Sequence, residues 1–179
     1  MAEYSDVERT ELLKLARQAI ASSLRGQRFE AGPQSPHLAE LRGAFTTLHR
    51  QGKLRGCIGY VEARKPLYQT VIETAQAAAF EDPRFQPVRP EELPELQIEI
   101  SVMSPLAEIA AEDVQVGVHG LLLSQHGRRG LLLPQVATEY SLSREEFLQE
   151  TCRKAGLPGD AWQNGARIEA FTAEVFGET

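Results

Sequence analysis

The chain has 179 residues, of which 42% are hydrophobic and 25% are charged, as in an ordinary globular domain. We therefore treat residues 1–179 as one domain that is long enough to bury a core without disulfides. The net charge of −6, with no basic stripe, argues against nucleic acid and anionic membranes as partners. There is no membrane-spanning apolar run and no signal-like N-terminus, and the two cysteines fit a reducing compartment, so we expect a cytoplasmic protein.

The first half of the chain predicts a helix, a hairpin and a second helix. Ser5 and Glu8 have the spacing of a capping box, and Leu13, Ala16 and Ile20 continue the helical period behind it. The expected elements are a helix over 5–25 stopped by Gly26, a loop over 28–42, hairpin strands over 43–50 and 54–61, and a helix that begins at Pro66 and is broken at Pro83.

The second half predicts mainly strands, with one longer helix. Ile98, Ile100 and Val102 alternate with polar residues, as in a half-buried strand over 97–103. The other expected elements are a helical turn over 90–93, a short strand over 114–118, hairpin strands over 121–124 and 130–133, a short helix over 134–140, a capped helix from Ser143 to Gly156, and a last strand over 168–176.

The segment Leu54–Gly59 is the most unusual part of the chain, because two glycines flank a cysteine inside a predicted strand. Glycine weakens a strand unless the strand bends or another group approaches its backbone closely. Strand alternation places Arg55, Cys57 and Gly59 on one face, with Gly59 leaving open space beside the thiol. This segment is therefore the candidate ligand-binding surface, with Gly56 and Gly59 permitting close approach.

Motifs along nearly the whole chain carry a resemblance to a known family. They lie at 54–59, 79–85, 98–104, 117–121, 130–136 and 154–157, and at Trp162. By these motifs the chain resembles the AMMECR family, known in bacteria and archaea as AmmeMemoRadiSam system protein A. One departure is Tyr140, which stands just after Glu139, where such proteins often carry a tryptophan.

The resemblance implies an α+β fold in which helices pack on a mixed or antiparallel sheet, with a larger and a smaller lobe around a cleft. We assign 1–105 and 165–179 to the larger lobe and 106–164 to the smaller one. The family has no established activity. Its prokaryotic name implies a link with a Memo-like protein of extradiol-dioxygenase fold and with a radical SAM protein, acting on an unidentified small molecule.

Cys57 is the main candidate for chemistry. A thiolate stabilised by a nearby cation can act as a nucleophile or a redox group, and Arg55 lies two residues away. The alternative is that Cys57 is a small buried hydrophobe, the commonest role of a free cysteine. Arg55 in turn either binds a carboxylate or phosphate or pairs with an acid such as Glu99 or Asp82.

Two further segments hold candidate residues. Asp82 and Arg84 form either a substrate-binding loop or a turn in which the aspartate caps backbone amides and pairs with the arginine. His119 is either a general base for Cys57 or a turn histidine. Cys152 is expected in the core, and His37 and His49 belong to no motif. The chain has no recognisable metal or nucleotide motif, so no metal and no cofactor are predicted.

Two functions fit these residues. The first is an enzyme or enzyme subunit with a small-molecule cleft, in which Cys57 reacts, Arg55 anchors an anion and His119 carries a proton. The second is a non-catalytic binding or scaffold module for the Memo-like and radical SAM partners, since the motifs do not complete a catalytic constellation.

Overall fold

The computed structural model describes residues 2–33 and 35–179. The chain divides into two compact units. The first unit runs from the N-terminus to Met103 and includes Glu174–Thr179, and the second unit is Ser104–Ala173. Residues 165–173, which the sequence placed in the larger lobe, fall in the second unit.

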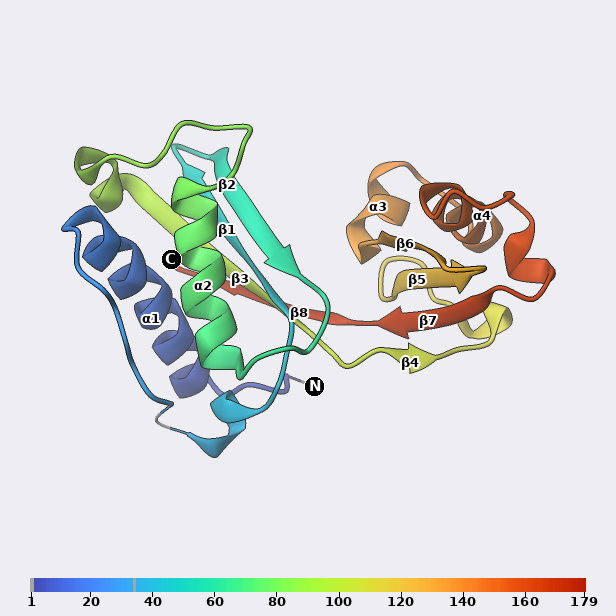
Figure 1. The fold of residues 1–179 in the computed structure, drawn as a ribbon, viewed down its shortest axis with the longest axis horizontal. Helices are drawn as coiled ribbons and strands as arrows, with labels where there is room; N and C mark the ends of the chain where they lie inside the picture. The colour runs from blue at the N-terminus through green and yellow to red at the C-terminus, as the bar shows by residue number, and fades with distance from the viewer. Residues whose placement is uncertain (1, 34) are drawn as a thin grey trace. The chain divides into compact units, whose positions relative to one another are not determined.

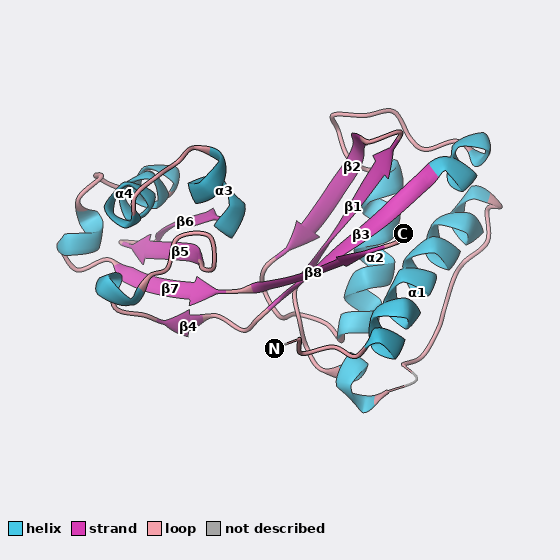
Figure 2. Cartoon of the chain, turned by 180° about the vertical axis from the view of Figure 1, so that it is seen from behind, coloured by secondary structure: helices cyan, strands magenta, loops and turns pink. Residues whose placement is uncertain are grey.

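The first unit is a four-stranded sheet with helices on one face. The strand order is β2-β1-β3-β8, and β1 pairs antiparallel with both β2 and β3. Figure 1 shows α2 in front of these strands, and Figure 2, from behind, shows the strands in front. The elements are α1 (Asp6–Leu24), η1 (Pro36–Ala39), β1 (Ala44–Arg50), β2 (Lys53–Tyr60), α2 (Leu67–Phe80), η2 (Pro90–Glu95), β3 (Leu96–Met103) and β8 (Ala173–Gly177).

Alternation along β1 separates the core of this unit from the second face of its sheet. Ala44, Thr46 and Leu48 are fully buried on the helix side, and the Thr46 hydroxyl lies 2.8 Å from the hydroxyl of Thr74 in α2. The residues between them are only partly buried.

The predicted capping box at Ser5 is confirmed at the start of α1. The hairpin turn has positive φ at Gln51 and Gly52, which suits a tight connection between twisted strands.

The second unit is a four-stranded sheet of order β4-β7-β5-β6 with its own core. Leu121 and Leu123 of β5 are fully buried with Phe147, Leu148 and Cys152 of α4, as predicted for Cys152. The elements are β4 (Ala107–Glu108), η3 (Ala111–Asp113), β5 (Gly120–Gln125), β6 (Arg128–Leu132), α3 (Pro134–Glu139), α4 (Arg144–Lys154), η4 (Ala161–Gln163) and β7 (Arg167–Phe171).

Two predicted strands are wrong. Residues 114–118 form no strand, and 116–118 form a turn with Gly117 at φ +84. The expected last strand over 168–176 is two strands, because the ladder is interrupted at Thr172. β7 pairs with β4 and β5, whereas β8 adjoins β3 in the other sheet, so one stretch of chain contributes residues to both cores.

Candidate functional site

Cys57 lies on β2, the edge strand of the first sheet, opposite Thr47 of β1. Its sulfur is 3.2 Å from the Thr47 hydroxyl oxygen, within hydrogen-bonding distance for sulfur. Cys57 is partly exposed, unlike the fully buried Cys152. The thiol is therefore not sealed in the core.

The loop after α2 binds both outward-facing backbone groups of Cys57. The Cys57 N–H donates to Asp82 Oδ2 at 3.0 Å, and Arg84 Nη2 donates to the Cys57 carbonyl oxygen at 3.4 Å. Arg84 also donates to both carboxylate oxygens of Asp82, at 3.0 and 2.8 Å. The loop thus takes the place of a neighbouring strand at this point of the edge.

The charges of this loop are held in place by burial and pairing. The Asp82 side chain is 2% exposed, whereas that of Arg84 is 55% exposed. The hydrogen bonds from Arg84, and next those from the backbone of Cys57 and Arg84, keep the pKa of Asp82 well below its usual range. The pKa of Arg84 is raised, chiefly by its hydrogen bond to Asp82 and also by the charge of that carboxylate. A half-exposed guanidinium thus lies 3.4 Å from the backbone carbonyl oxygen of Cys57.

Arg55 is engaged elsewhere. It donates to both oxygens of Glu92 in η2, at 2.9 and 3.2 Å, and Arg50 binds the same carboxylate at 3.0 Å. The hydrogen bond from Arg55 first, then one from the Arg89 backbone and the charges of Arg55 and Arg50, lower the pKa of Glu92 to about 2. This is an ion pair of the kind given as the alternative, with Glu92 rather than Glu99 or Asp82 as the partner, and anion binding by Arg55 stays a prediction. A bulge in the β1–β2 pairing, between Leu48 and His49, also interrupts the alternation from which a shared face with Cys57 was inferred.

The two glycines of the motif are explained by packing. A Cβ on Gly56 would lie 2.1 Å from the carbonyl oxygen of Ala78, so the missing side chain lets β2 approach α2. A Cβ on Gly59 would lie 2.3 Å from the Ala44 carbonyl oxygen and 2.5 Å from Phe45 Cγ. The predicted open space at Gly59 is wrong, because the neighbouring strand and the Phe45 side chain occupy it.

His119 belongs to the second unit, where its Nδ1 accepts a hydrogen bond from the Gln115 N–H at 3.0 Å. The backbone N–H of His119 donates a hydrogen bond to the Gln115 carbonyl oxygen at 3.0 Å. These contacts fit the interpretation as a turn histidine. The structure thus brings together Cys57, Asp82 and Arg84 of the predicted site, and a site shared with His119 stays a prediction.

The sequence missed Thr47 and Glu92, since neither belongs to a recognisable motif. Cross-strand register alone puts Thr47 beside the thiol.

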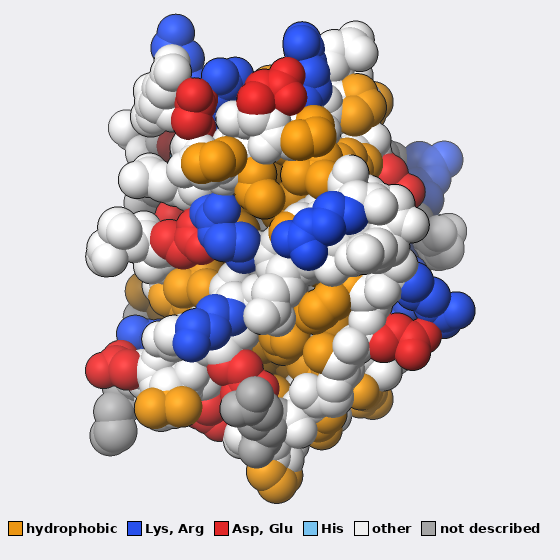
Figure 3. Space-filling model, turned by 90° about the vertical axis from the view of Figure 1, so that its left-hand side faces the viewer, with side chains coloured by type: hydrophobic (Ala, Val, Ile, Leu, Met, Phe, Trp, Pro, Cys, Tyr) orange, Lys and Arg blue, Asp and Glu red, His pale blue; other side chains and the backbone are white. Residues whose placement is uncertain are grey.

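On the face drawn in Figure 3, basic and acidic side chains are interspersed among hydrophobic ones, without a continuous basic patch. Within residues 2–33 and 35–179, no helix combines the length and hydrophobicity needed to cross a bilayer.

Comparison with known proteins gives one consistent family. The AMMECR1 family model matches residues 13–176. A protein from Methanothermobacter thermautotrophicus is 44% identical, covering 98% of both chains, and one from Thermococcus gammatolerans is 44% identical, covering 93% of this chain and 88% of its own. The crystal structure of an uncharacterised protein from Pyrococcus horikoshii has a TM-score of 0.77 and 42% identity, covering 94% of this chain and 90% of its own. This structural relative supports the α+β fold.

Proposed function

Since the chain belongs to the AMMECR1 family, we propose that Cys57 and Arg84 form its ligand-binding and reactive centre. The observation that carries the proposal is that a half-exposed guanidinium, held on a buried carboxylate, binds the backbone carbonyl oxygen of the partly exposed Cys57. A fixed guanidinium binds carboxylate or phosphate groups, so the ligand is a small anionic molecule. Cys57 is the nucleophile or redox thiol.

Each neighbouring group has a physical role in this proposal. Arg84 stabilises a thiolate and anchors the anion, while Asp82 positions Arg84. The Thr47 hydroxyl, 3.2 Å from the sulfur, can donate a hydrogen bond to the thiolate. Gly56 and Gly59 permit the packing that fixes the strand, and Arg55 binds Glu92 of η2.

The proposal extends to partners that the family resemblance suggests, a Memo-like protein and a radical SAM protein. In this view the chain supplies a thiol-bearing subunit to a three-part system acting on a small molecule. The alternative is a non-catalytic scaffold for the same two proteins. One observation favours the scaffold. The backbone N–H and carbonyl oxygen of Cys57 are both hydrogen-bonded to the loop after α2, as expected for an edge strand with a purely structural role.

Thiol labelling tests the reactive centre. Native protein is treated with iodoacetamide at pH 7, and each cysteine is followed by mass spectrometry. We expect Cys57 to react while Cys152, which is fully buried, stays protected and serves as the internal reference. Replacing Arg84 with Gln should slow labelling of Cys57 by about fivefold or more, because the cation that favours the thiolate is lost. Millimolar phosphate or acetate should protect Cys57 in the wild type but not in Arg84→Gln.

The outcomes separate the two functions. A Cys57 that reacts no faster than Cys152 in the folded protein contradicts a reactive centre. Native mass spectrometry with a Memo-like and a radical SAM protein then tests the scaffold. If Cys57→Ser binds both partners and supports their joint activity as well as the wild type does, the scaffold function replaces the reactive one. If neither partner binds, the proposed association is wrong.

A further inference from the structure

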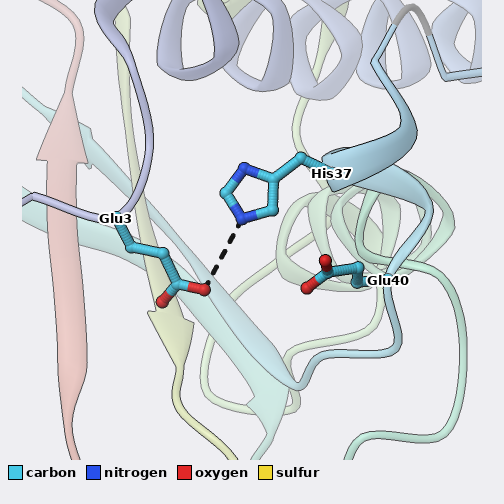
Figure 4. Close-up of side chains that lie close together, drawn as sticks. All are labelled: Glu3, His37 and Glu40. Atoms are coloured by element: carbon cyan, nitrogen blue, oxygen red, sulfur yellow. Dashed lines mark ion pairs between the residues drawn. The ribbon is translucent and has the colours of Figure 1, made fainter.

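A second cluster of ligand-type side chains lies in the first unit, away from the Cys57 motif. Glu3, His37 and Glu40 each place one donor atom so that all three atoms lie within 4.8 Å of one another. His37 Nε2 is 3.5 Å from Glu3 Oε1, and the Glu40 carboxylate points toward the same space (Figure 4). Their side chains are 27–50% exposed, so an ion can reach them from solvent.

His37 is oriented as metal-bound histidines usually are. Its Nδ1 lies 3.1 Å from Glu8 Oε1. The Glu8 carboxylate also accepts hydrogen bonds from the Ser5 backbone N–H and the Ser35 hydroxyl, each at 3.0 Å, so it is held in place beside Nδ1. A carboxylate at Nδ1 favours the tautomer with its proton there, which leaves the Nε2 lone pair free toward Glu3.

The space between the carboxylates already attracts a cation. Arg42 Nη2 is 3.1 Å from Glu3 Oε1 and 3.1 Å from Glu40 Oε2, which places one positive group between the two acids. The pairing is incomplete, because Arg42 Nε is buried and has no partner among the described residues. Any metal ion must compete with this guanidinium.

Tyr4 supplies an independent observation at the same place. Tyr4 is 2% exposed, and its hydroxyl has no hydrogen-bond partner among the described residues. Its ring stacks on His37 at 4.6 Å. This stacking places Tyr4 directly against the histidine of the cluster. A buried hydroxyl left unpaired is costly unless a further group, such as a metal-bound water, completes it.

We propose that Glu3, His37 and Glu40 bind a divalent transition metal of the zinc type, with Arg42 as the competing internal cation. One imidazole and two carboxylates suit Zn²⁺, with water in the fourth position, whereas an imidazole disfavours Mg²⁺. The metal would tie the segment before α1 to η1, so its binding would stabilise the folded state. No short motif reveals the site, because Glu3 is distant in sequence from His37 and Glu40.

The test uses full-length protein without a histidine tag. Thermal unfolding and isothermal titration calorimetry are recorded with ZnCl₂ and, as a control, with MgCl₂. We expect Zn²⁺ at about ten times its Kd to raise Tm by a few degrees and Mg²⁺ to have no effect. His37→Gln should weaken Zn²⁺ binding by at least about tenfold. His49→Gln, a histidine of β1 outside the cluster, should bind Zn²⁺ as the wild type does.

Arg42→Gln distinguishes a metal site from a set of ion pairs. If Arg42 competes for the carboxylates, its removal should tighten Zn²⁺ binding by about tenfold even though the metal-free protein is less stable. Binding in Arg42→Gln is measured by calorimetry on protein whose circular dichroism spectrum is native. The proposal is overturned if millimolar Zn²⁺ neither binds nor raises Tm, if His37→Gln and His49→Gln behave alike, or if Arg42→Gln binds Zn²⁺ no more tightly.

Discussion

A single methyl group at Gly56 would test how closely β2 packs on α2. In Gly56→Ala the new Cβ would lie 2.1 Å from the Ala78 carbonyl oxygen, a backbone atom that cannot move without shifting the helix. We expect a loss of about 2–3 kcal/mol in the free energy of unfolding, as for other overpacked core positions. Urea unfolding followed by circular dichroism measures it.

Gly32→Ala is the matched control for this substitution. Gly32 is exposed, has no atom within 4 Å of an added Cβ and does not adopt positive φ, so the change should be close to neutral. An unfolding free energy of Gly56→Ala within about 0.5 kcal/mol of the wild type would show that β2 does not need glycine there.

Residue roles that depend on nearby sequence could be predicted, and those that depend on distant partners could not. The capping boxes at Ser5 and Ser143 are local and are confirmed. The partner of Arg55 is Glu92 of η2, which lies 37 residues further along the chain. Likewise, Phe45 covers Gly59 through cross-strand pairing, which strand alternation alone does not reveal.

At the scale of elements, hydrophobic period and turn residues predict most helices and strands correctly. They fail where two sheets share one stretch of chain. The run over 168–176 has continuous strand character, yet β7 and β8 belong to different sheets. The bulge near Arg55 is equally hidden, because it arises from pairing between β1 and β2 and not from either strand alone.

The loop that covers the edge of β2 at Cys57 depends on the charge of Asp82. Replacing Asp82 with Asn removes the ion pair with Arg84 and weakens the hydrogen bond from the Cys57 N–H. We expect the folded protein to lose about 2 kcal/mol or more, since a buried charged partner is removed. The Cys57 amide should also exchange with solvent at least about tenfold faster, as measured by hydrogen exchange and NMR.

Glu81→Gln is the control for Asp82→Asn, because Glu81 precedes it in the same loop and is exposed. It should leave both the stability and the exchange of the Cys57 amide close to wild type. If the Cys57 amide exchanges with solvent no faster in Asp82→Asn than in Glu81→Gln, the loop does not hold the edge strand through the Asp82 carboxylate.

At the scale of the whole molecule, the strongly perturbed carboxyls gather in the first unit. The pKa of Glu8 and that of Glu92 are each lowered to about 2, and that of Asp82 lies further below its usual range. In the described part of the second unit, Glu145 is the carboxyl with a clearly lowered pKa, and it is exposed. The two units should therefore respond differently to acid.

Acid should loosen the first unit before the second. Because the folded pKa of Glu92 lies below its usual value of 4.5, the unfolded state binds more protons, and stability is lost as the pH falls from about 5 toward 2. Glu92 alone accounts for about 2 kcal/mol between pH 5 and pH 3 by this relation. Hydrogen-exchange mass spectrometry at these two pH values, corrected for intrinsic rates, should show larger loss of protection in β1–β3 than in β5–β7. Glu92→Gln should reduce that pH dependence in the first unit, and an equal loss in both units, or an unchanged pH dependence in Glu92→Gln, would contradict this assignment.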